Sequence, residues 1–129
     1  MARKTILIVE DDRDLVDTLT TVLESAEYEV VSAANGQTGW QKAQQVNPDL
    51  AVVDMMMDTV AEGYDLTRRF RSDENMKNMP IIMVTAINQR FPLDMGQPDD
   101  DKYLPVDKFL EKPVDPGSLL QQIAELLGK

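Results

Sequence analysis

Residues 49–58 read Asp49-Leu-Ala-Val-Val-Asp54-Met-Met-Met-Asp58. The apolar run at residues 50–53 is short, follows Pro48, and ends abruptly at the carboxylate of Asp54. Four to eight apolar residues between turn signals are typical of a buried strand. In an open parallel sheet, ligands bind outside the carboxyl ends of the strands. Asp54 therefore stands where a ligand is expected, and the other strand ends decide what surrounds it.

The composition of the chain limits its chemistry. A length of 129 residues suits one domain, spanning residues 1–129, with its own core. The net charge of −10, from 13 basic and 23 acidic residues, disfavours nucleic acid and anionic membranes, because phosphate groups demand clustered Lys and Arg. It suits a metal cation or a basic partner surface. The absence of Cys and His excludes disulfides, thiolate nucleophiles and imidazole chemistry. Carboxylates, hydroxyls, lysines and the backbone remain.

No apolar segment of the sequence is long enough to cross a membrane. The apolar run behind the basic start covers only residues 6–9, which is too short for a signal peptide. The sequence therefore predicts a cytoplasmic protein.

Strand-like and helix-like segments alternate along the chain. Apolar and β-branched runs predict strands at residues 6–9, 29–33, 50–53, 81–84 and 108–110. Apolar residues at helical spacing predict helices at residues 15–26, 37–46, 64–71 and 116–127. This alternation predicts a doubly wound α/β domain, with a five-stranded parallel sheet and helices on both faces.

Local signals mark the ends and inner faces of these helices. Asp12 or a neighbour is expected to cap the first helix, and Asp115 the last, which has Pro116 at its first position and Gly128 at its end. Residues predicted to face the core from the second and third helices are Trp40, Ala43, Val46, Leu66 and Phe70.

One helix of the alternation is missing between the last two strands. Residues 87–106 contain Pro92, Pro98 and Pro105, and a proline inside a helix costs about 3 kcal/mol. The fourth helix is therefore expected to be irregular or replaced by a loop, with at most a turn or two near residues 99–104. The cluster Asp99-Asp100-Asp101 fits a solvated loop better than a Ca²⁺ site.

Polar residues gather at the carboxyl ends of the predicted strands. The first strand is followed by Glu10 and Asp11, the third by Asp54, the fourth by Thr85 and the fifth by Lys112. Clustered carboxylates repel one another unless a cation neutralises them, and Mg²⁺ prefers oxygen ligands. A carboxylate can also attack phosphorus to form an aspartyl phosphate. The pattern indicates a Mg²⁺-dependent phosphoryl-transfer site.

Four motifs together resemble the receiver domain of two-component response regulators. They are Val9-Glu10-Asp11-Asp12, Val52-Val53-Asp54-Met-Met-Met, Val84-Thr85-Ala86 and Phe109-Leu-Glu-Lys112-Pro113. The resemblance covers nearly the whole chain and keeps the order of all four motifs. It implies a flavodoxin-like sheet with strand order 2-1-3-4-5. Because the last predicted helix ends at Gly128, no output domain is expected within residues 1–129, and a stand-alone, cytoplasmic signalling protein is the expectation unless these residues are part of a longer protein.

The resemblance also assigns roles to residues. It implies that Asp54 is the phosphoacceptor, that Thr85 and Lys112 contact the phosphoryl group, and that Thr85 and Phe109 form the switch. It implies a cis peptide bond between Lys112 and Pro113. The implied Mg²⁺ ligands are Glu10, Asp11, Asp54 and the backbone carbonyl of Met56.

The partners that the resemblance implies are proteins. A sensor histidine kinase or a histidine phosphotransfer protein donates the phosphoryl group, directly or within a phosphorelay, and a downstream protein target reads the outcome. Neither nucleic acid nor membrane is expected to bind. The chain is not expected to be an enzyme beyond its own phosphorylation and dephosphorylation.

The sequence departs from the family pattern around the acceptor. Asp58 replaces the usual proline of the following loop, and Gly63 comes one residue late. Two positions after Asp54 and two after Thr85, polar side chains can orient an attacking water, but Met56 and Ile87 stand there. We therefore expect slow self-dephosphorylation.

Two other functions fit parts of the pattern. A phosphatase of haloacid-dehalogenase type also uses Mg²⁺ and a strand-end Asp, but it needs a second Asp where Met56 stands. A receiver-like binding module could act without phosphorylation. Taken alone, Glu10, Asp11 and Asp12 would be ordinary acids at a helix N-terminus.

Overall fold

The computed structural model describes residues 3–55, 60–85 and 106–128. Within them the chain forms five strands and four helices. In chain order the elements are β1 (Thr5–Val9), α1 (Arg13–Ser25), β2 (Glu29–Ala33), α2 (Gly36–Val46), β3 (Leu50–Asp54), α3 (Val60–Ser72), β4 (Ile81–Thr85), β5 (Lys108–Glu111) and α4 (Pro116–Leu127).

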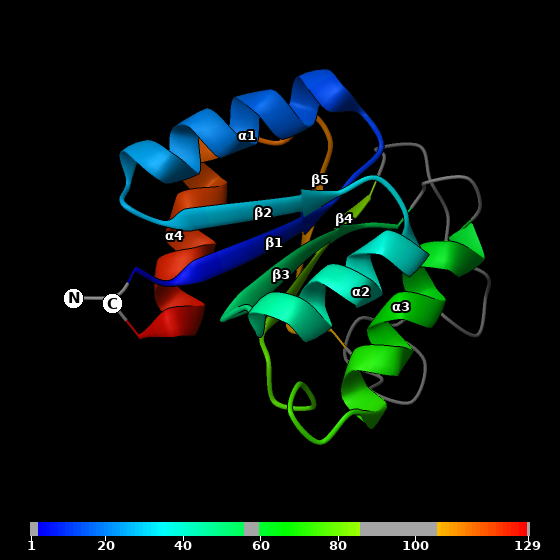
Figure 1. The fold of residues 1–129 in the computed structure, drawn as a ribbon. Coiled ribbons are helices and arrows are strands. Elements are labelled where there is room, and N and C mark those ends of the chain that lie inside the picture. Colours follow the sequence, from blue (N-terminus) through cyan, green and yellow to red (C-terminus); the bar gives the residue numbers. More distant parts are fainter. Residues whose placement is uncertain (1–2, 56–59, 86–105, 129) are drawn as a thin grey trace.

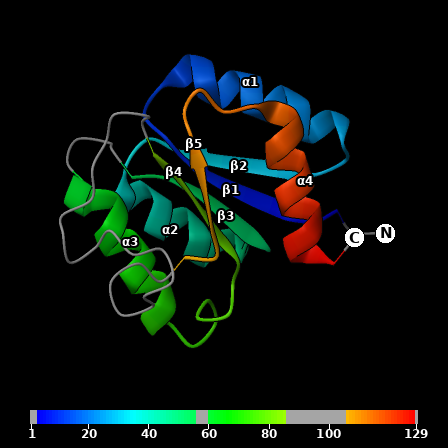
Figure 2. The same cartoon turned by 180° about the vertical axis from the view of Figure 1, so that it is seen from behind.

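The strands form one parallel sheet in the order β2-β1-β3-β4-β5. Helices α1 and α4 cover one face of the sheet, and α2 and α3 cover the other (Figures 1 and 2). This is the doubly wound architecture and strand order that the sequence predicted. Strands β1 and β3 lie side by side although α1, β2 and α2 separate them in sequence, and the order reverses between them.

The core has two halves, one on each side of the sheet. Successive strand side chains point to opposite faces, so alternate residues of one strand enter different halves. On the face covered by α2 and α3 lie Leu7, Val9, Val53 and Met83; on the face covered by α1 and α4 lie Ile6, Ile8, Val52 and Val84. Strands that are buried on both faces have continuous apolar sequences, and for this reason β1, β3 and β4 could be predicted from their apolar runs.

Side-chain caps define the helix ends. Asp12 accepts hydrogen bonds from the backbone N–H groups of Asp14 and Leu15, and Asp115 accepts one from Ser118. Gly128 ends α4 in the left-handed conformation at φ 77°. The predictions for Asp12, Asp115 and Gly128 are confirmed.

Arg71 ties the end of α3 to the starts of β4 and β5. Its guanidinium donates to the carbonyls of Lys77 (3.1 Å) and Met79 (2.7 Å), and to Asp107 Oδ2 at 2.9 Å. The same Asp107 oxygen accepts the backbone N–H of Ile81 at 2.8 Å. These bonds hold the connection between α3 and β4 at the amino ends of the strands, opposite the carboxyl ends where the polar residues gather.

Two local predictions were wrong. Val46 does not face the core, because it is the last residue of α2 and its side chain is 39% exposed. The third helix begins at Val60, not at residue 64, so Gly63 lies within it rather than in the preceding loop. The prediction of an irregular segment at residues 87–106 lies outside the described residues, apart from Val106.

Candidate functional site

The carboxyl ends of four strands bring the polar residues together. Asp54 is the last residue of β3 and Thr85 the last of β4, while Glu10 directly follows β1 and Lys112 directly follows β5. Backbone hydrogen bonds continue the sheet beyond these ends. Met55 N–H donates to Val84 O at 2.9 Å and Lys112 N–H donates to Thr85 O at 2.7 Å. The site residues are therefore attached to the rigid part of the fold.

Asp54 and Glu10 are buried acids that share one cation. Asp54 is 1% exposed and Glu10 is 4% exposed. The ammonium of Lys112 lies 3.3 Å from Asp54 Oδ2 and 3.5 Å from Glu10 Oε1. Within the described residues, this is the most buried group of charges, and charges leave water only when they are paired or bind an ion.

Burial changes the ionisation of Glu10. Burial raises the pKa of Glu10 to about 8, and its hydrogen bond with Asp54 and the charge of Asp54 act in the same direction. The backbone N–H of Asp12, which donates to Glu10 Oε2 at 3.1 Å, and the charge of Lys112 oppose this shift. In the metal-free protein Glu10 therefore carries a proton at neutral pH, which reduces the repulsion from Asp54.

Lys112 responds in the opposite sense. Partial burial lowers the pKa of its ammonium, but the charges of Asp54 and Glu10 outweigh that effect, so its pKa is raised. Lys112 consequently stays charged at neutral pH beside the two acids. The peptide bond between Lys112 and Pro113 is cis, as expected.

The site has the donor set of an oxygen-ligand cation. Carboxylate oxygens of Glu10, Asp11 and Asp54 all lie within 4.8 Å of one another. Asp11 is exposed while the other two are buried, so the cluster opens toward solvent on one side. Hard divalent cations take one or two carboxylates and keep several waters, and this half-open arrangement fits that preference. The predicted fourth ligand, the Met56 carbonyl, lies outside the described residues.

Thr85 and Phe109 flank the charged group. Thr85 is 6% exposed and pairs in register with Glu111 of β5. Phe109 pairs with Met83 and is half-buried against the core on the α2 and α3 face. Thr85 thus lies next to Asp54 on the neighbouring strand, and Phe109 lies one strand further out.

Gly63 is a site residue whose role the sequence analysis missed. A Cβ atom at Gly63 would lie 2.7 Å from the carbonyl oxygen of Asp54 and 3.0 Å from Met55 Cα. Glycine therefore lets α3 rest directly on the backbone that carries Asp54. The available signal was a glycine among helix-forming residues, but the loop interpretation concealed it.

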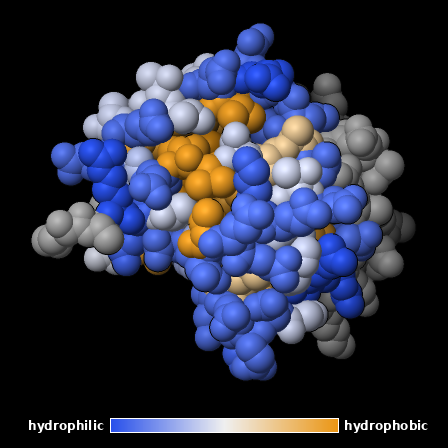
Figure 3. Space-filling view, viewed as in Figure 1, coloured by the Kyte–Doolittle hydropathy of each residue, from blue (hydrophilic) through white to orange (hydrophobic). Residues whose placement is uncertain are grey.

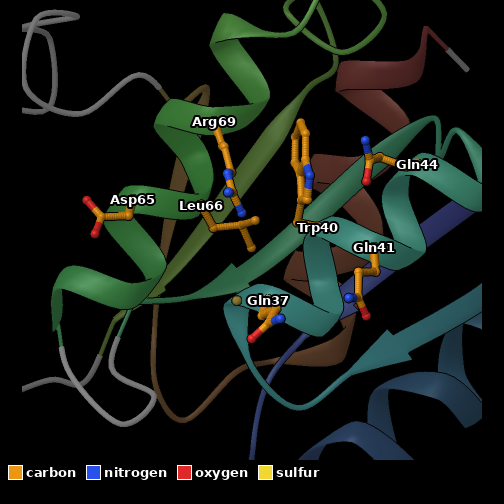
Figure 4. A pocket seen from close by; sticks show the side chains of 8 residues that line it. Gln37, Trp40, Gln41, Gln44, Asp65, Leu66 and Arg69 are labelled. Carbon is orange, nitrogen blue, oxygen red and sulfur yellow. The ribbon is translucent and has the colours of Figure 1, made fainter.

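A separate hollow of about 680 Å³ opens between α2 and α3 (Figure 4). The guanidinium of Arg69 stacks over the indole of Trp40 at 5.1 Å, whereas Asp65 points away. No group of acids within metal-binding distance lies there among the described residues. The carboxylate cluster, and not this hollow, is therefore the candidate site for an oxygen-ligand cation.

The fold and the cluster define a doubly wound α/β domain with an acidic site at its topological switch point, the class to which receiver domains belong. The model of the response regulator receiver domain matches residues 6–124, and the chain belongs to this family. This is a signalling domain of two-component systems. None of the described helices has the length and apolar character of a membrane span.

Two curated relatives illustrate the family. The DNA-binding dual master transcriptional regulator RpaA of Synechocystis is 35% identical over 96% of this chain and 49% of its own length. Protein PilH of Pseudomonas aeruginosa is 33% identical over 99% of both chains. The chain spans about half the length of the first curated relatives that it matches.

Solved structures share the fold. A CheY-like response regulator receiver domain protein of Methanospirillum hungatei has a TM-score of 0.82 and 31% identity, covering 98% of this chain and 95% of its own. The receiver domain of sensor histidine kinase PA1611 of P. aeruginosa, solved with a magnesium ion in its active-site cleft, has a TM-score of 0.78 and 25% identity, covering 99% of this chain and 100% of its own.

Proposed function

We propose that this domain takes a phosphoryl group from the phosphohistidine of a sensor histidine kinase or a histidine phosphotransfer protein, in a Mg²⁺-dependent reaction, onto Asp54. The phosphorylated domain then binds a downstream protein target differently. The observation that carries the proposal is the buried Asp54 carboxylate, which lies 3.3 Å from Lys112 and within 4.8 Å of the oxygens of Glu10 and Asp11.

The geometry suits nucleophilic attack by Asp54. One carboxylate oxygen forms a bond to phosphorus while the phosphorus–nitrogen bond of the donor breaks, and the electron pair leaves with the nitrogen. Asp54 ends β3, so the sheet holds its backbone in place at the edge where the donor would approach. Positioning and electrostatic stabilisation supply most of the catalysis in phosphoryl transfer.

Charge balance explains the other residues. Three carboxylates face a single ammonium, so the site favours a dication once Glu10 has lost its proton. Bound Mg²⁺ would neutralise charge on the transferring oxygens. Once Asp54 carries the phosphoryl group, the ammonium of Lys112 would move from the Asp54 carboxylate to one phosphoryl oxygen. The Thr85 hydroxyl on the adjacent strand would donate a hydrogen bond to another phosphoryl oxygen. The Mg²⁺-bound structure of the PA1611 receiver domain supports this use of the cluster.

We infer that the partners of residues 1–129 are proteins. The net charge of −10 opposes binding to a phosphate backbone by this chain itself. RpaA is named a DNA-binding regulator, but the match covers only 49% of its length. A direct test is titration of the purified chain with duplex DNA, and binding at physiological salt would refute this part.

Slow self-dephosphorylation belongs to the proposal as well. Its argument rests on the apolar side chains of Met56 and Ile87, which lie outside the described residues. The decay of the phosphorylated protein measures it. A polar side chain substituted at position 56 or 87 should shorten the half-life of the phosphorylated protein. An unchanged half-life would contradict the argument.

The deciding experiment is intact-mass measurement after incubation with acetyl phosphate, with and without Mg²⁺. Wild type is compared with Asp54→Asn and with the matched control Asp49→Asn at the other end of β3, where an amide oxygen can still accept from Thr5 N–H. We expect a gain of one phosphoryl group in wild type and the control only when Mg²⁺ is present. No gain in wild type would favour the phosphorylation-independent binding module, and turnover of a phosphate monoester would favour the phosphatase.

A further inference from the structure

The outer edge of β2 is an open strand edge. Strand β2 pairs with β1 on one side and has no strand partner on the other within the described residues. Helices α1 and α2 flank this edge without crossing it (Figure 1). Proteins usually protect such edges with Pro, charges or bulges, because they can pair with another chain. In β2 the only charged residue is Glu29 at its start.

The hydrogen-bond pattern shows which backbone groups face outward. Glu29 N–H donates to Lys4 O, and Ala33 O accepts from Glu10 N–H, both at 2.9 Å. In a parallel pair, alternate residues direct both backbone groups toward the neighbour. Glu29, Val31 and Ala33 therefore bond to β1, and Val30 and Ser32 direct their N–H and C=O groups to the open side.

A stripe of apolar surface crosses this edge (Figure 3). Figure 3 shows hydrophobic residues that run from α1 across β2 toward the end of α2. Val30 and Val31 are half-buried, and Val46 at the end of α2 is the exposed large hydrophobic residue among those described. Apolar surface beside unpaired strand groups is characteristic of strand-addition sites.

We propose that β2 is a homodimer interface, at which β2 of a second copy adds antiparallel across a twofold axis beside Val31. In this register Val31 faces Val31 of the second copy, and Val30 faces Ser32. The outward N–H and C=O groups of both residues then pair as they do in an antiparallel sheet. The two sheets become one sheet of ten strands, from the five in each copy.

Charge complementarity selects a second copy as the occupant. Val31 packs on the α2 and α3 face, so Glu29 and Ala33, two residues away on either side, face the same way. Lys42 of α2 lines a hollow beside Ser32 and Ala33, at the other end of the strand from Glu29. The twofold axis brings Glu29 of each copy to the Lys42 end of the other.

The same hollow provides space for the partner strand. Its volume is about 280 Å³, and its charged lining residues are the bases Arg13 and Lys42 and the acids Glu10 and Asp17. Val16, Ser32, Ala33, Ala34 and Thr38 complete the lining. In the proposed register it receives the Glu29 and Val30 side chains of the second copy. Glu29 enters on the α2 side, where Lys42 is the cation, and Val30 enters on the α1 side, where Val16 is an apolar contact and Asp17 lies on the same helix. Neither Glu29 nor Lys42 forms an ion pair with another described residue.

The interface leaves Asp54 open. Glu10 of the candidate site lines the hollow, but Asp54 does not. Because the two β2 strands run antiparallel, the carboxyl ends of the two sheets point in opposite directions, and each Asp54 keeps its access to solvent and to a donor. Dimerisation is therefore expected whether or not Asp54 is phosphorylated, and the proposal does not depend on the proposed function.

The first test substitutes proline for a residue whose N–H faces outward. Ser32→Pro removes no bond to β1, and proline is tolerated at edge positions of this kind. It removes two intermolecular hydrogen bonds per dimer, so we expect self-association to weaken roughly ten- to hundredfold in sedimentation experiments. The matched control Ser32→Ala should associate like wild type. Amide exchange at Val30 and Ser32 should slow with rising wild-type concentration, while Val31 stays protected throughout.

The second test exchanges charges. Glu29→Lys and Lys42→Glu should each weaken self-association, and an equimolar mixture of the two variants should associate as well as wild type, because every ion pair is then restored. A wild type that stays monomeric at NMR concentrations would overturn the proposal and leave the edge to a strand of another protein. Association that Ser32→Pro leaves unchanged, or a mixture without rescue, would assign the dimer to a different surface.

Discussion

Replacing Gly63 by alanine tests how closely α3 packs on the end of β3. Two effects oppose each other. Alanine is a better helix former than glycine by about 1 kcal/mol, which favours the variant. The new Cβ would lie 2.7 Å from Asp54 O, 3.0 Å from Met55 Cα and 3.1 Å from Met55 O, which opposes it.

The contact distances decide between these effects. Favourable contacts between non-bonded carbons lie at about 3.5–4.0 Å, so the new methyl group would overlap three backbone atoms. These atoms belong to a buried strand end and cannot rotate away as a side chain could. Overpacking of this kind costs about 1–3 kcal/mol. With a clash near the upper end of that range, the net loss is about 2 kcal/mol.

Urea unfolding monitored by circular dichroism measures this loss. We expect Gly63→Ala to lower the midpoint with an unchanged slope, since the surface exposed on unfolding is the same. Gly117→Ala is the matched control, because its Cβ would meet only Asp115 Oδ2, at 3.5 Å. The control should equal or slightly exceed the stability of wild type.

The same variant should also perturb the candidate site. If α3 moves to relieve the overlap, the support beneath Asp54 and Met55 is lost, and phosphorylation by acetyl phosphate should slow in Gly63→Ala but not in Gly117→Ala. A Gly63→Ala protein as stable as wild type, or more stable, would contradict the estimated loss of about 2 kcal/mol. It would mean that helix propensity outweighs the contact.

Four further predictions concern charged residues. Lys112→Gln should slow phosphorylation about a hundredfold while Mg²⁺ still binds, because an electrostatic contact to the transferring group is lost; an unchanged rate would remove Lys112 from the mechanism. Since burial raises the pKa of Glu10 to about 8, Mg²⁺ would have to displace a proton from Glu10 when it binds. The apparent Mg²⁺ affinity, measured by calorimetric titration, should therefore rise with pH up to about 8 and level off above it. The same titration of Glu10→Gln should show a flatter pH dependence. The metal-free domain should lose stability as pH rises from 4.5 toward 8, because the folded state then holds the proton more tightly than the unfolded state. Arg71→Ala should lower the free energy of unfolding in urea by about 1–3 kcal/mol, because two carbonyls and Asp107 lose their donor. The control Lys77→Ala, which removes an exposed ion pair with Glu74, should change it by less than about 0.5 kcal/mol. Equal effects of the two substitutions would contradict the role given to Arg71.

The close match between predicted and observed strands has a physical cause. Parallel strands buried on both faces require apolar side chains at every position, so β1, β3 and β4 appear as uninterrupted runs that end where a polar residue becomes tolerable. The ends of these runs are also where the site residues stand. The signal that identified the strands therefore located Glu10, Asp54 and Thr85 without further assumptions.

The errors arose where local pattern and tertiary contact disagree. Val46 has the helical spacing of an inward residue, but α2 ends there, and the last turn extends past the core. Gly63 resembles a loop residue because glycine weakens helices, yet its place in α3 follows from the lack of space above Asp54. Neither fact can be deduced from a window of neighbouring residues, because each depends on an element elsewhere in the chain.

Hydrophobic periodicity and strand ends are local properties, so the class of fold, the helix caps and the residues that meet at the carboxyl edge could all be predicted from the sequence. How these residues interact depends on contacts between distant segments. The tertiary structure places Lys112 3.3 Å from Asp54 although they are 58 residues apart, buries Glu10 so that its pKa rises, and sets α3 on the backbone of Asp54 and Met55. It also leaves the outer edge of β2 open, since strand order is fixed by crossovers and packing between distant segments and not by any single stretch of sequence.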